Sequence, residues 1–208
     1  RLKDAWFWVI PISATVTSIG VVAHKGAGLR PGESREAFFR RKVGESQWLS
    51  QTIASAVAEG EYRVESDYSF SYETFGAQRV LLAGDAASFI DPVFSSGVFL
   101  AMTSGLLAAK LLSKELAAAR PDPTLYARYT REMKDQIKVM RRLIDSYYDN
   151  PTYEVFMTPK PPLGLARSVN SVLAGCLKPP FSVRWRFRIF ELICSIHKRR
   201  PIVPKLNW

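Results

Sequence analysis

The chain has 208 residues, of which 47% are hydrophobic and 23% are charged, and its net charge is +10. This composition excludes a chain that is disordered throughout. The charge is uneven, because the segment from Lys178 to Trp208 holds eight basic residues and one acidic residue. The charge therefore indicates an acidic partner or surface at that end, and it does not by itself indicate nucleic-acid binding.

The first third of the chain is expected to hold strands and one helix. Residues 6–23 are rich in aromatic and β-branched side chains, with a break at Pro11, which predicts two strands in an antiparallel pair. After a loop rich in glycine and proline, the apolar spacing of Glu36–Glu59 predicts one helix, with Gly60 as its cap.

Two further strands are expected before the middle of the chain. Residues 62–74 alternate loosely between polar and apolar side chains, which indicates a strand. The run Arg79–Ala83 is short and continuously apolar, which is typical of a buried parallel strand. It stops at Gly84-Asp85.

The second half is expected to be helical. The apolar run Phe94–Leu112 contains hydroxyl side chains and a lysine, which indicates a buried helix and no transmembrane segment. A Pro-rich stretch, Pro151–Pro162, is expected to be irregular. The helices are predicted at Gly97–Ala119, Leu125–Tyr148, Leu163–Leu177 and Val183–Lys198.

The cysteines and histidines suggest no metal site. Cys176 and Cys194 lie in apolar helical patterns, so we expect buried, reduced thiols in a cytoplasmic protein. His24 and His197 are isolated in the sequence and are expected at the surface.

The last predicted helix combines basic and apolar faces. Arg184, Arg188 and Glu191 share one face, and apolar side chains form another. This pattern favours a docking or membrane-surface element over nucleic-acid binding, with a solvated helix on the core as the alternative.

The segment most indicative of chemistry runs from Val80 to Val98. It predicts a buried strand, a Gly84-Asp85 turn, a loop of small residues and the start of a helix near Ser96. The turn offers one carboxylate beside backbone that a planar ligand can approach, and the helix start offers free N–H groups to an anion. A plain strand–turn–helix unit without a ligand is the alternative.

The sequence GDAA, followed by Pro92 and then Gly97, resembles the second flavin-binding motif of FAD-dependent monooxygenase-type oxidoreductases. The resemblance implies that Gly84 and Asp85 hold the ribitol of FAD. It also implies that the flavin is bordered by Ala86, Pro92, Gly97 and Val98.

The longer string SFIDPVFSSGV resembles flavin-dependent halogenases more than aromatic hydroxylases. In that family the amides of a Ser/Thr-Gly pair bind the halide, chloride or bromide, and here the pair is Ser96-Gly97. A second motif agrees, because the run from Trp6 to Pro11 matches W-x-W-x-I-P, which is thought to keep organic substrate away from the flavin. Its matching residues are Trp6, Trp8, Ile10 and Pro11.

The departures from the family pattern are informative. The chain has neither the G-x-G-x-x-G turn that holds the FAD pyrophosphate nor the lysine of the family's catalytic motif. It therefore resembles the C-terminal portion of such an enzyme. Phe94 stands where halogenases of tryptophan have a glutamate, which favours the phenol or pyrrole type. Asp91 matches a position that is linked to the flavin in some relatives, but no linkage is expected here.

The resemblance implies a partial α/β (α+β) flavoprotein fold of the FAD-dependent monooxygenase type with a mostly helical C-terminal region. It divides the chain into a substrate-side sheet and helix (1–76), a flavin-binding strand–turn–helix (77–120) and a helical region (121–208). The implied reaction uses FADH2 from a separate flavin reductase, oxygen and halide to halogenate a small electron-rich aromatic substrate, which an acyl or peptidyl carrier protein could hold. The alternatives are a related FAD monooxygenase or reductase, or an inactive fragment or docking module if the protein begins at Arg1.

Overall fold

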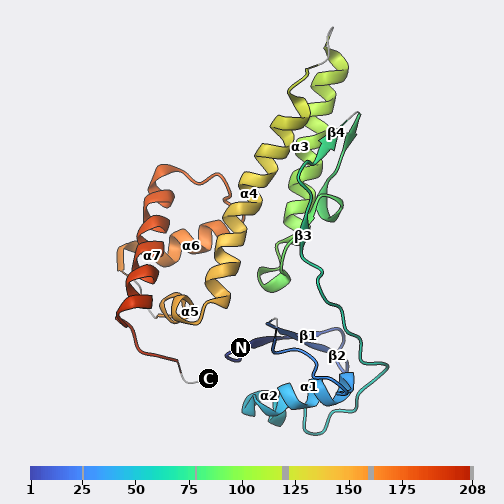
Figure 1. Ribbon diagram of the computed structural model, residues 1–208, viewed down its shortest axis with the longest axis vertical. Coiled ribbons are helices and arrows are strands. Elements are labelled where there is room, and N and C mark those ends of the chain that lie inside the picture. The colour runs from blue at the N-terminus through green and yellow to red at the C-terminus, as the bar shows by residue number, and fades with distance from the viewer. Residues whose placement is uncertain (25, 78, 119–121, 159–161, 207–208) are drawn as a thin grey trace. The chain divides into compact units, whose positions relative to one another are not determined.

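The computed structural model describes residues 1–24, 26–77, 79–118, 122–158 and 162–206. The chain folds as two compact units, Arg1–Ser66 and Asp67–Lys205 (Figure 1). The functional division at residues 76 and 120 stays a prediction.

The first unit begins with the predicted antiparallel pair, which is confirmed. Strand β1 (Ala5–Pro11) pairs with β2 (Thr17–Ala23), and Trp8 lies opposite Gly20. A Cβ atom on Gly20 would lie 1.9 Å from Cζ2 of the Trp8 ring. Glycine is therefore required on β2, because the indole ring lies across the strand at this point.

The helical part of the first unit differs from the prediction of one helix. Helix α1 (Arg35–Gly44) and helix α2 (Gln47–Thr52) are separate. The reason is Ser46, whose hydroxyl accepts a hydrogen bond from the Leu49 amide at 3.3 Å and starts a second helix. Gly60 follows eight residues after the end of α2 and caps neither helix.

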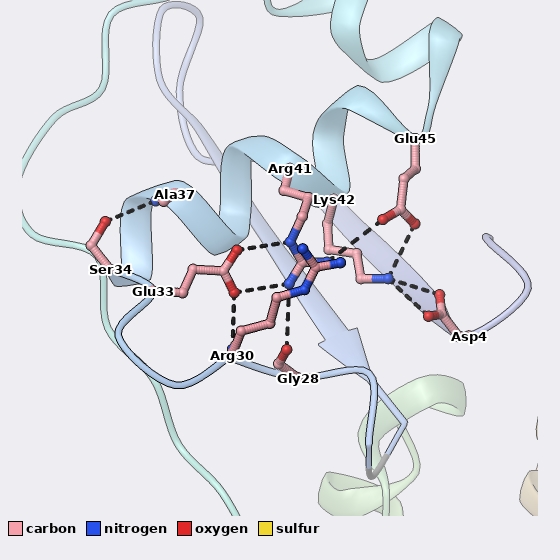
Figure 2. Close-up of polar contacts among 9 residues, drawn as sticks. All are labelled: Asp4, Gly28, Arg30, Glu33, Ser34, Ala37, Arg41, Lys42 and Glu45. Carbon is pink, nitrogen blue, oxygen red and sulfur yellow. Dashed lines mark hydrogen bonds and ion pairs between the residues drawn. The ribbon is translucent and has the colours of Figure 1, made fainter.

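A polar cluster holds α1 against the chain that precedes it (Figure 2). Lys42 is 2% exposed, and its Nζ lies 2.9 Å from both carboxylate oxygens of Asp4 and 3.1 Å from Glu45. Beside it, Arg41 makes a two-bond ion pair with Glu33, at 2.7 and 2.9 Å. Such planar, bidentate pairs are the stronger class of ion pair, so α1 is fixed to both β1 and the loop.

The Glu33 pair predicts acid sensitivity in the first unit. The hydrogen bond from Arg41, and then that from the Arg30 amide, lowers the pKa of Glu33 from its ordinary 4.5 to about 2. A lowered pKa adds stability above pH 4.5, and this stability is lost as the pH falls towards 2. We expect Glu33→Gln to be less stable than wild type at pH 7 and to lose less stability on acidification, as measured by urea unfolding at pH 7, 4.5 and 3.

Glu36→Gln serves as the control, because Glu36 pairs with Arg40 on the exposed side of α1. This variant is expected to keep the wild-type pH dependence, since exposed i,i+4 pairs contribute little. Parallel pH profiles for Glu33→Gln and wild type would contradict the prediction.

The strands of the second unit are short. Strand β3 (Phe70–Ser71) pairs antiparallel with β6 (Ser88–Phe89), and β4 (Gly76–Ala77) pairs antiparallel with β5 (Val80–Leu81). Only Phe70–Ser71 of the predicted strand 62–74 is extended in a ladder.

The prediction of a buried parallel strand at Arg79–Ala83 is wrong for this structure. Val80 is 55% exposed, and β5 pairs antiparallel with β4. An apolar run does not specify its pairing partner, and in the described residues the nearest available strand is antiparallel.

The helices of the second unit largely follow the sequence pattern. Helix α4 (Leu125–Tyr148) has the predicted bounds, and α3 (Gly97–Ala117) begins at the predicted residue. The Pro-rich stretch contains an unpredicted helix, α5 (Asn150–Phe156), because Asp149 accepts a hydrogen bond from the Thr152 amide and Pro151 is tolerated in a first turn. Two further helices follow, α6 (Leu165–Leu173) and α7 (Phe181–Arg199).

Helix α4 forms the centre of this unit, with α3 on one side and α5, α6 and α7 on the other (Figure 1). Tyr129, Met140 and Leu143 of α4 are at most 1% exposed. In α7, burial raises the pKa of the Cys194 thiol to about 12, in keeping with a thiol that stays protonated. Cys176 is only partly buried, which differs from the prediction.

The surface position predicted for His197 is wrong. The ring is 2% exposed, and its Nε2 lies 2.9 Å from Glu154 of α5. Its Nδ1 accepts the Ile202 amide at 2.9 Å, which fixes the segment after α7. The isolated position in the sequence gave no sign of these partners, because they come from another helix and from the chain that follows.

Helix α3 is less buried than the sequence suggests. Val98, Met102, Leu106 and Leu116 are 73%, 71%, 58% and 86% exposed, so one apolar face is open in the structure. By length and composition, α3 is the one helix in the described ranges that could cross a membrane, which is weak evidence for a span. The opposite face packs against α4, and the candidate site lies at the N-terminal end of the helix.

Candidate functional site

The turn after β5 is built against α3. Gly84, the first residue of a 3-10 turn (η1, Gly84–Ala86), has φ +56°, and an added Cβ would lie 2.9 Å from that of Ala101. Its amide donates to the Ser104 hydroxyl at 2.8 Å, and this hydroxyl donates to the Ala101 carbonyl at 2.9 Å. Ser104 is 1% exposed. The left-handed backbone and the contact with α3 both require glycine at this position.

A second buried hydroxyl holds the strand that leads into the turn. Tyr129 of α4 is 0% exposed, and its hydroxyl donates to the Leu82 carbonyl at 2.7 Å. Burial raises the pKa of Tyr129, so it remains a donor at neutral pH. Neither Ser104 nor Tyr129 was recognised from the sequence, because each looks like an ordinary member of a helix face.

The loop after the turn is held by Asp91. This residue precedes a second 3-10 turn (η2, Pro92–Phe94); its Oδ1 accepts the Val93 amide at 2.9 Å, and its Oδ2 accepts the Tyr148 hydroxyl at 2.6 Å. Burial and then the nearby Asp91 carboxylate raise the pKa of Tyr68. Both carboxylate oxygens therefore take part in fixing the loop.

The chain then reverses into α3 through Ser95, which has φ 51° and ψ 33°. A left-handed serine costs free energy and persists only where its surroundings impose it. Its amide donates to the Pro92 carbonyl at 2.8 Å, which closes the turn.

The N-terminus of α3 has unsatisfied donors. Ser96 is 5% exposed and stands at the N-cap position, yet its hydroxyl makes no capping bond and has no hydrogen-bond partner among the described residues. Among the described residues, no hydrogen-bond acceptor is found for the backbone amides of Ser96, Gly97, Val98 and Phe99. Free amides at the positive end of a helix dipole favour an anion.

The backbone at Gly97 is open. A Cβ added there would meet nothing within 4 Å, and the residue does not have the left-handed φ that favours glycine. Packing within the described chain does not explain the absence of a side chain at this position. The missing side chain leaves space for a flat group or an ion to approach the free amides, so this region fits a flavin and a halide.

Aromatic side chains lie beside this helix start. The ring of Phe94 has its centroid 5.6 Å from that of Tyr147 and 6.3 Å from that of Phe156. The side chain before Ser95 therefore packs against aromatic rings. Among the described residues no cluster of three or more His, Cys, Asp or Glu side chains could hold a metal ion.

The structure brings together the predicted flavin and halide residues but divides the two motifs between units. Asp85, Ala86 and Val98 are exposed, and Ser96 is buried. These residues all lie on one continuous stretch of the second unit, from η1 to the first turn of α3. The predicted cofactor and halide positions in this stretch, which stay a prediction, are Gly84, Asp85, Ala86, Pro92, Ser96, Gly97 and Val98.

The W-x-W-x-I-P residues belong to β1 in the first unit. Trp6 is 9% exposed, and its ring meets that of Trp8 edge to face at 6.3 Å. Ile10 is 52% exposed and Pro11 is exposed. The indole of Trp8 also donates to the Ser18 hydroxyl at 3.3 Å, so both rings are held by the sheet.

Comparison with known proteins gives consistent results. A family model described as tryptophan halogenase matches residues 2–155. The flavin-dependent halogenase otaD of Aspergillus niger is 33% identical over 128 residues, which are 59% of this chain and 27% of that protein. The 1H-pyrrole-2-carbonyl-[peptidyl-carrier protein] chlorinase of Pseudomonas fluorescens is 29% identical over 147 residues, 71% of this chain and 33% of that protein.

Solved structures agree on the fold. A flavoprotein/dehydrogenase from Cytophaga hutchinsonii aligns with a TM-score of 0.78 and 25% identity, over 95% of this chain and 49% of that one. The flavin-dependent brominase Bmp2 aligns with a TM-score of 0.72 and 25% identity, over 95% and 49% of the two chains. The chain thus spans about half the length of these structures and about a third or less of these curated relatives.

Proposed function

The chain belongs to the tryptophan halogenase family, and from this membership we propose that its protein is a flavin-dependent halogenase of an electron-rich aromatic ring. The observation that carries the proposal is the N-terminus of α3, with its free amides and the unpartnered, buried hydroxyl of Ser96. Bound FADH2, delivered by a separate flavin reductase, would supply the electrons that activate oxygen for oxidation of the halide.

The role proposed for Ser96 and Gly97 is to hold chloride or bromide. A halide is a monovalent anion that accepts hydrogen bonds and needs no directional partner, so a cluster of amides at a positive dipole end suits it. The serine hydroxyl can add one donor without any rearrangement of the backbone. This residue pair would therefore keep the ion at a fixed place beside the flavin.

The role proposed for the turn is to hold the flavin. Asp85 is exposed in η1 and would offer a carboxylate to the ribitol hydroxyl groups, while Gly84 and Ala86 let the chain approach closely. Pro92 and Val98 would border the ring. The pyrophosphate would be held by residues outside this sequence.

The role proposed for Trp6 and Trp8 is to separate the flavin from the organic substrate. Their edge-to-face contact and their seat on β1 make a rigid apolar wall. Ile10 and Pro11 would extend the wall. Water and substrate would be excluded by these side chains, so the oxidising species reaches halide first.

The substrate proposed is a phenol or a pyrrole, which an acyl or peptidyl carrier protein can hold. Phe94 stands where halogenases of tryptophan have a glutamate, so this position has no carboxylate, which suits a ring that is already electron-rich. A pyrrole attached to a carrier protein is named for the Pseudomonas fluorescens relative. A flavoenzyme that acts without halide is the second candidate, because one structural neighbour is titled a dehydrogenase.

The test is a reaction of the full-length protein with FAD, NADH, a flavin reductase and bromide. We expect monobrominated products from phenols or pyrroles, visible as the bromine isotope doublet, and none without reductase or bromide. A folded, flavin-loaded protein that yields only hydroxylated or reduced product would overturn the proposal and favour the second candidate.

A further inference from the structure

Two adjoining cavities lie along α4 in the second unit, and the larger one is also lined by α7. The larger has a volume of about 550 Å³ and the smaller about 290 Å³, and both are lined by Asp135, Leu177 and Lys178. The larger one has an apolar floor that includes Val172 and Phe187, which are 1% and 8% exposed. We call this surface the basic cavity, for the charges around it.

The rim of the basic cavity carries more positive than negative charge. Three acidic side chains face the cations: Glu132, Asp135 and Glu191. Arg142 lies 3.6 Å from Glu191, and Lys178 pairs with Glu132. The cations are Arg128, Arg131, Arg142, Lys178, Arg184 and Arg188.

Three of these cations are unpaired. Arg131, Arg184 and Arg188 are exposed and have no ion-pair partner in the part of the chain that the structure describes. Arg184 and Arg188 are one helical turn apart, so they face the cavity together. Unpaired guanidinium groups above an apolar floor suit an anionic partner that also buries an apolar group.

A series of tilted and edge-to-face ring contacts connects the basic cavity to Phe94, beside the proposed halide site. The ring of Phe94 meets Phe156 at 6.3 Å, Phe156 meets Phe190 at 6.4 Å, and Phe190 meets Phe187 at 6.1 Å. Phe187 lines the cavity, and Phe94 is two residues before Ser96. The three centroid distances together come to less than about 20 Å, which is the span of six residues of fully extended chain.

We propose that the basic cavity docks an acidic carrier protein that delivers the aromatic substrate. The inference rests on the proposed function and adds the surface on which that partner binds. Charge complementarity steers such an encounter, and an apolar group of the partner in the cavity would anchor it. The ring contacts limit the separation between Phe187 at the cavity and Phe94 beside the proposed halide site to less than about 20 Å.

A protein suits this surface better than nucleic acid or a membrane. Trp185 is covered by the Arg186 guanidinium at 4.5 Å, which occupies a face on which a base could stack. The apolar floor of the cavity, which includes Val172 and Phe187, is buried among charges, whereas a membrane-surface helix presents its apolar face outward. The exposed apolar residues of α7, which are Phe181, Leu192 and Ile196, do not line the cavity. The basic helix α7 is thus a docking element with a specific concave partner site.

The test measures binding of an acidic acyl carrier protein, with and without its phosphopantetheine arm, to the full-length enzyme. We expect Arg184→Glu/Arg188→Glu to weaken binding at least tenfold, and we expect wild-type binding to weaken as salt rises. The control is Arg199→Glu/Arg200→Glu, which makes the same charge change at the exposed far end of α7. Melting curves verify that both variants are folded. If Arg184→Glu/Arg188→Glu is not folded, Arg184→Gln/Arg188→Gln is used in its place.

The outcomes separate this inference from the proposed function. Loss of binding of both carrier forms supports docking of the acidic protein surface, and loss confined to the armed form supports recognition of the arm's phosphate on that protein. The inference would be overturned if the control variant weakened carrier-protein binding as much as Arg184→Glu/Arg188→Glu does. It would also be overturned if Arg184→Glu/Arg188→Glu lost binding to vesicles with anionic lipid to the same extent as binding to the carrier protein. Bromination of a free phenol is expected to be unchanged in Arg184→Glu/Arg188→Glu. If the wild-type enzyme did not brominate the free phenol, the proposed function would be refuted and the binding result would still stand.

Discussion

Gly97→Ala is expected to lower the rate of halogenation by at least about 100-fold, the scale of a misplacement of reacting groups by 1 Å. The added methyl group would meet no atom within 4 Å outside the adjacent backbone of α3, so it would occupy open space beside the helix start. Because nothing in the protein opposes that methyl group, the free energy of unfolding should stay equal or rise by up to about 1 kcal/mol. A more stable but inactive protein is the result to look for.

The measurement pairs single-turnover halogenation with urea unfolding of the same samples. The matched control is Gly44→Ala, which also adds a methyl group to a helical glycine with nothing within 4 Å, but in α1. This control should keep wild-type activity. If Gly97→Ala retained activity within threefold of wild type, the approach of a ligand to the α3 amides would be refuted.

Ser104→Ala is expected to have the opposite pattern, with stability and flavin affinity both reduced. The Gly84 amide would lose its acceptor at 2.8 Å, and an unsatisfied buried donor costs about 1–3 kcal/mol. Without this bond the turn is no longer tied to α3, so we also expect the dissociation constant for FAD to rise at least about tenfold, which is 1.4 kcal/mol.

The experiment compares urea unfolding of the flavin-free protein with FAD titration followed by fluorescence. Ser113→Ala is the control, since Ser113 is an exposed serine of the same helix and should leave both quantities unchanged. Tyr129→Phe is a second probe, because it removes the donor to the Leu82 carbonyl. A Ser104→Ala protein that matches Ser113→Ala in both measurements would contradict the positioning role.

The sequence was sufficient where a local pattern specifies a local structure. The aromatic and β-branched run predicted β1 and β2, and the apolar spacing predicted the bounds of α4. In the same way, the order strand, GDAA turn, small loop and helix start predicted a continuous candidate site from Gly84 to Val98. Motif resemblance supplied the family, which the family model then matched over residues 2–155.

The errors arose where a choice between neighbouring structures depends on one hydrogen bond. Ser46 starts a new helix inside a stretch whose apolar pattern is continuous, and Asp149 starts a helix inside a Pro-rich stretch. The pattern of Arg79–Ala83 is equally compatible with parallel and antiparallel pairing, and the structure selected the antiparallel strand β4. In each case the deciding partner is invisible to hydrophobic periodicity.

The sequence by itself determined the main elements and the chemical character of the candidate site, because helix and strand patterns and short motifs depend on residues close together in the chain. Only the tertiary structure decided which groups hold that site. Ser104 is 20 residues from Gly84, Tyr129 is 47 from Leu82 and Tyr148 is 57 from Asp91. These bonds form only once α3 and α4 have packed, since packing is what brings donors and acceptors that are distant in sequence within 3 Å and removes the water that would otherwise satisfy them.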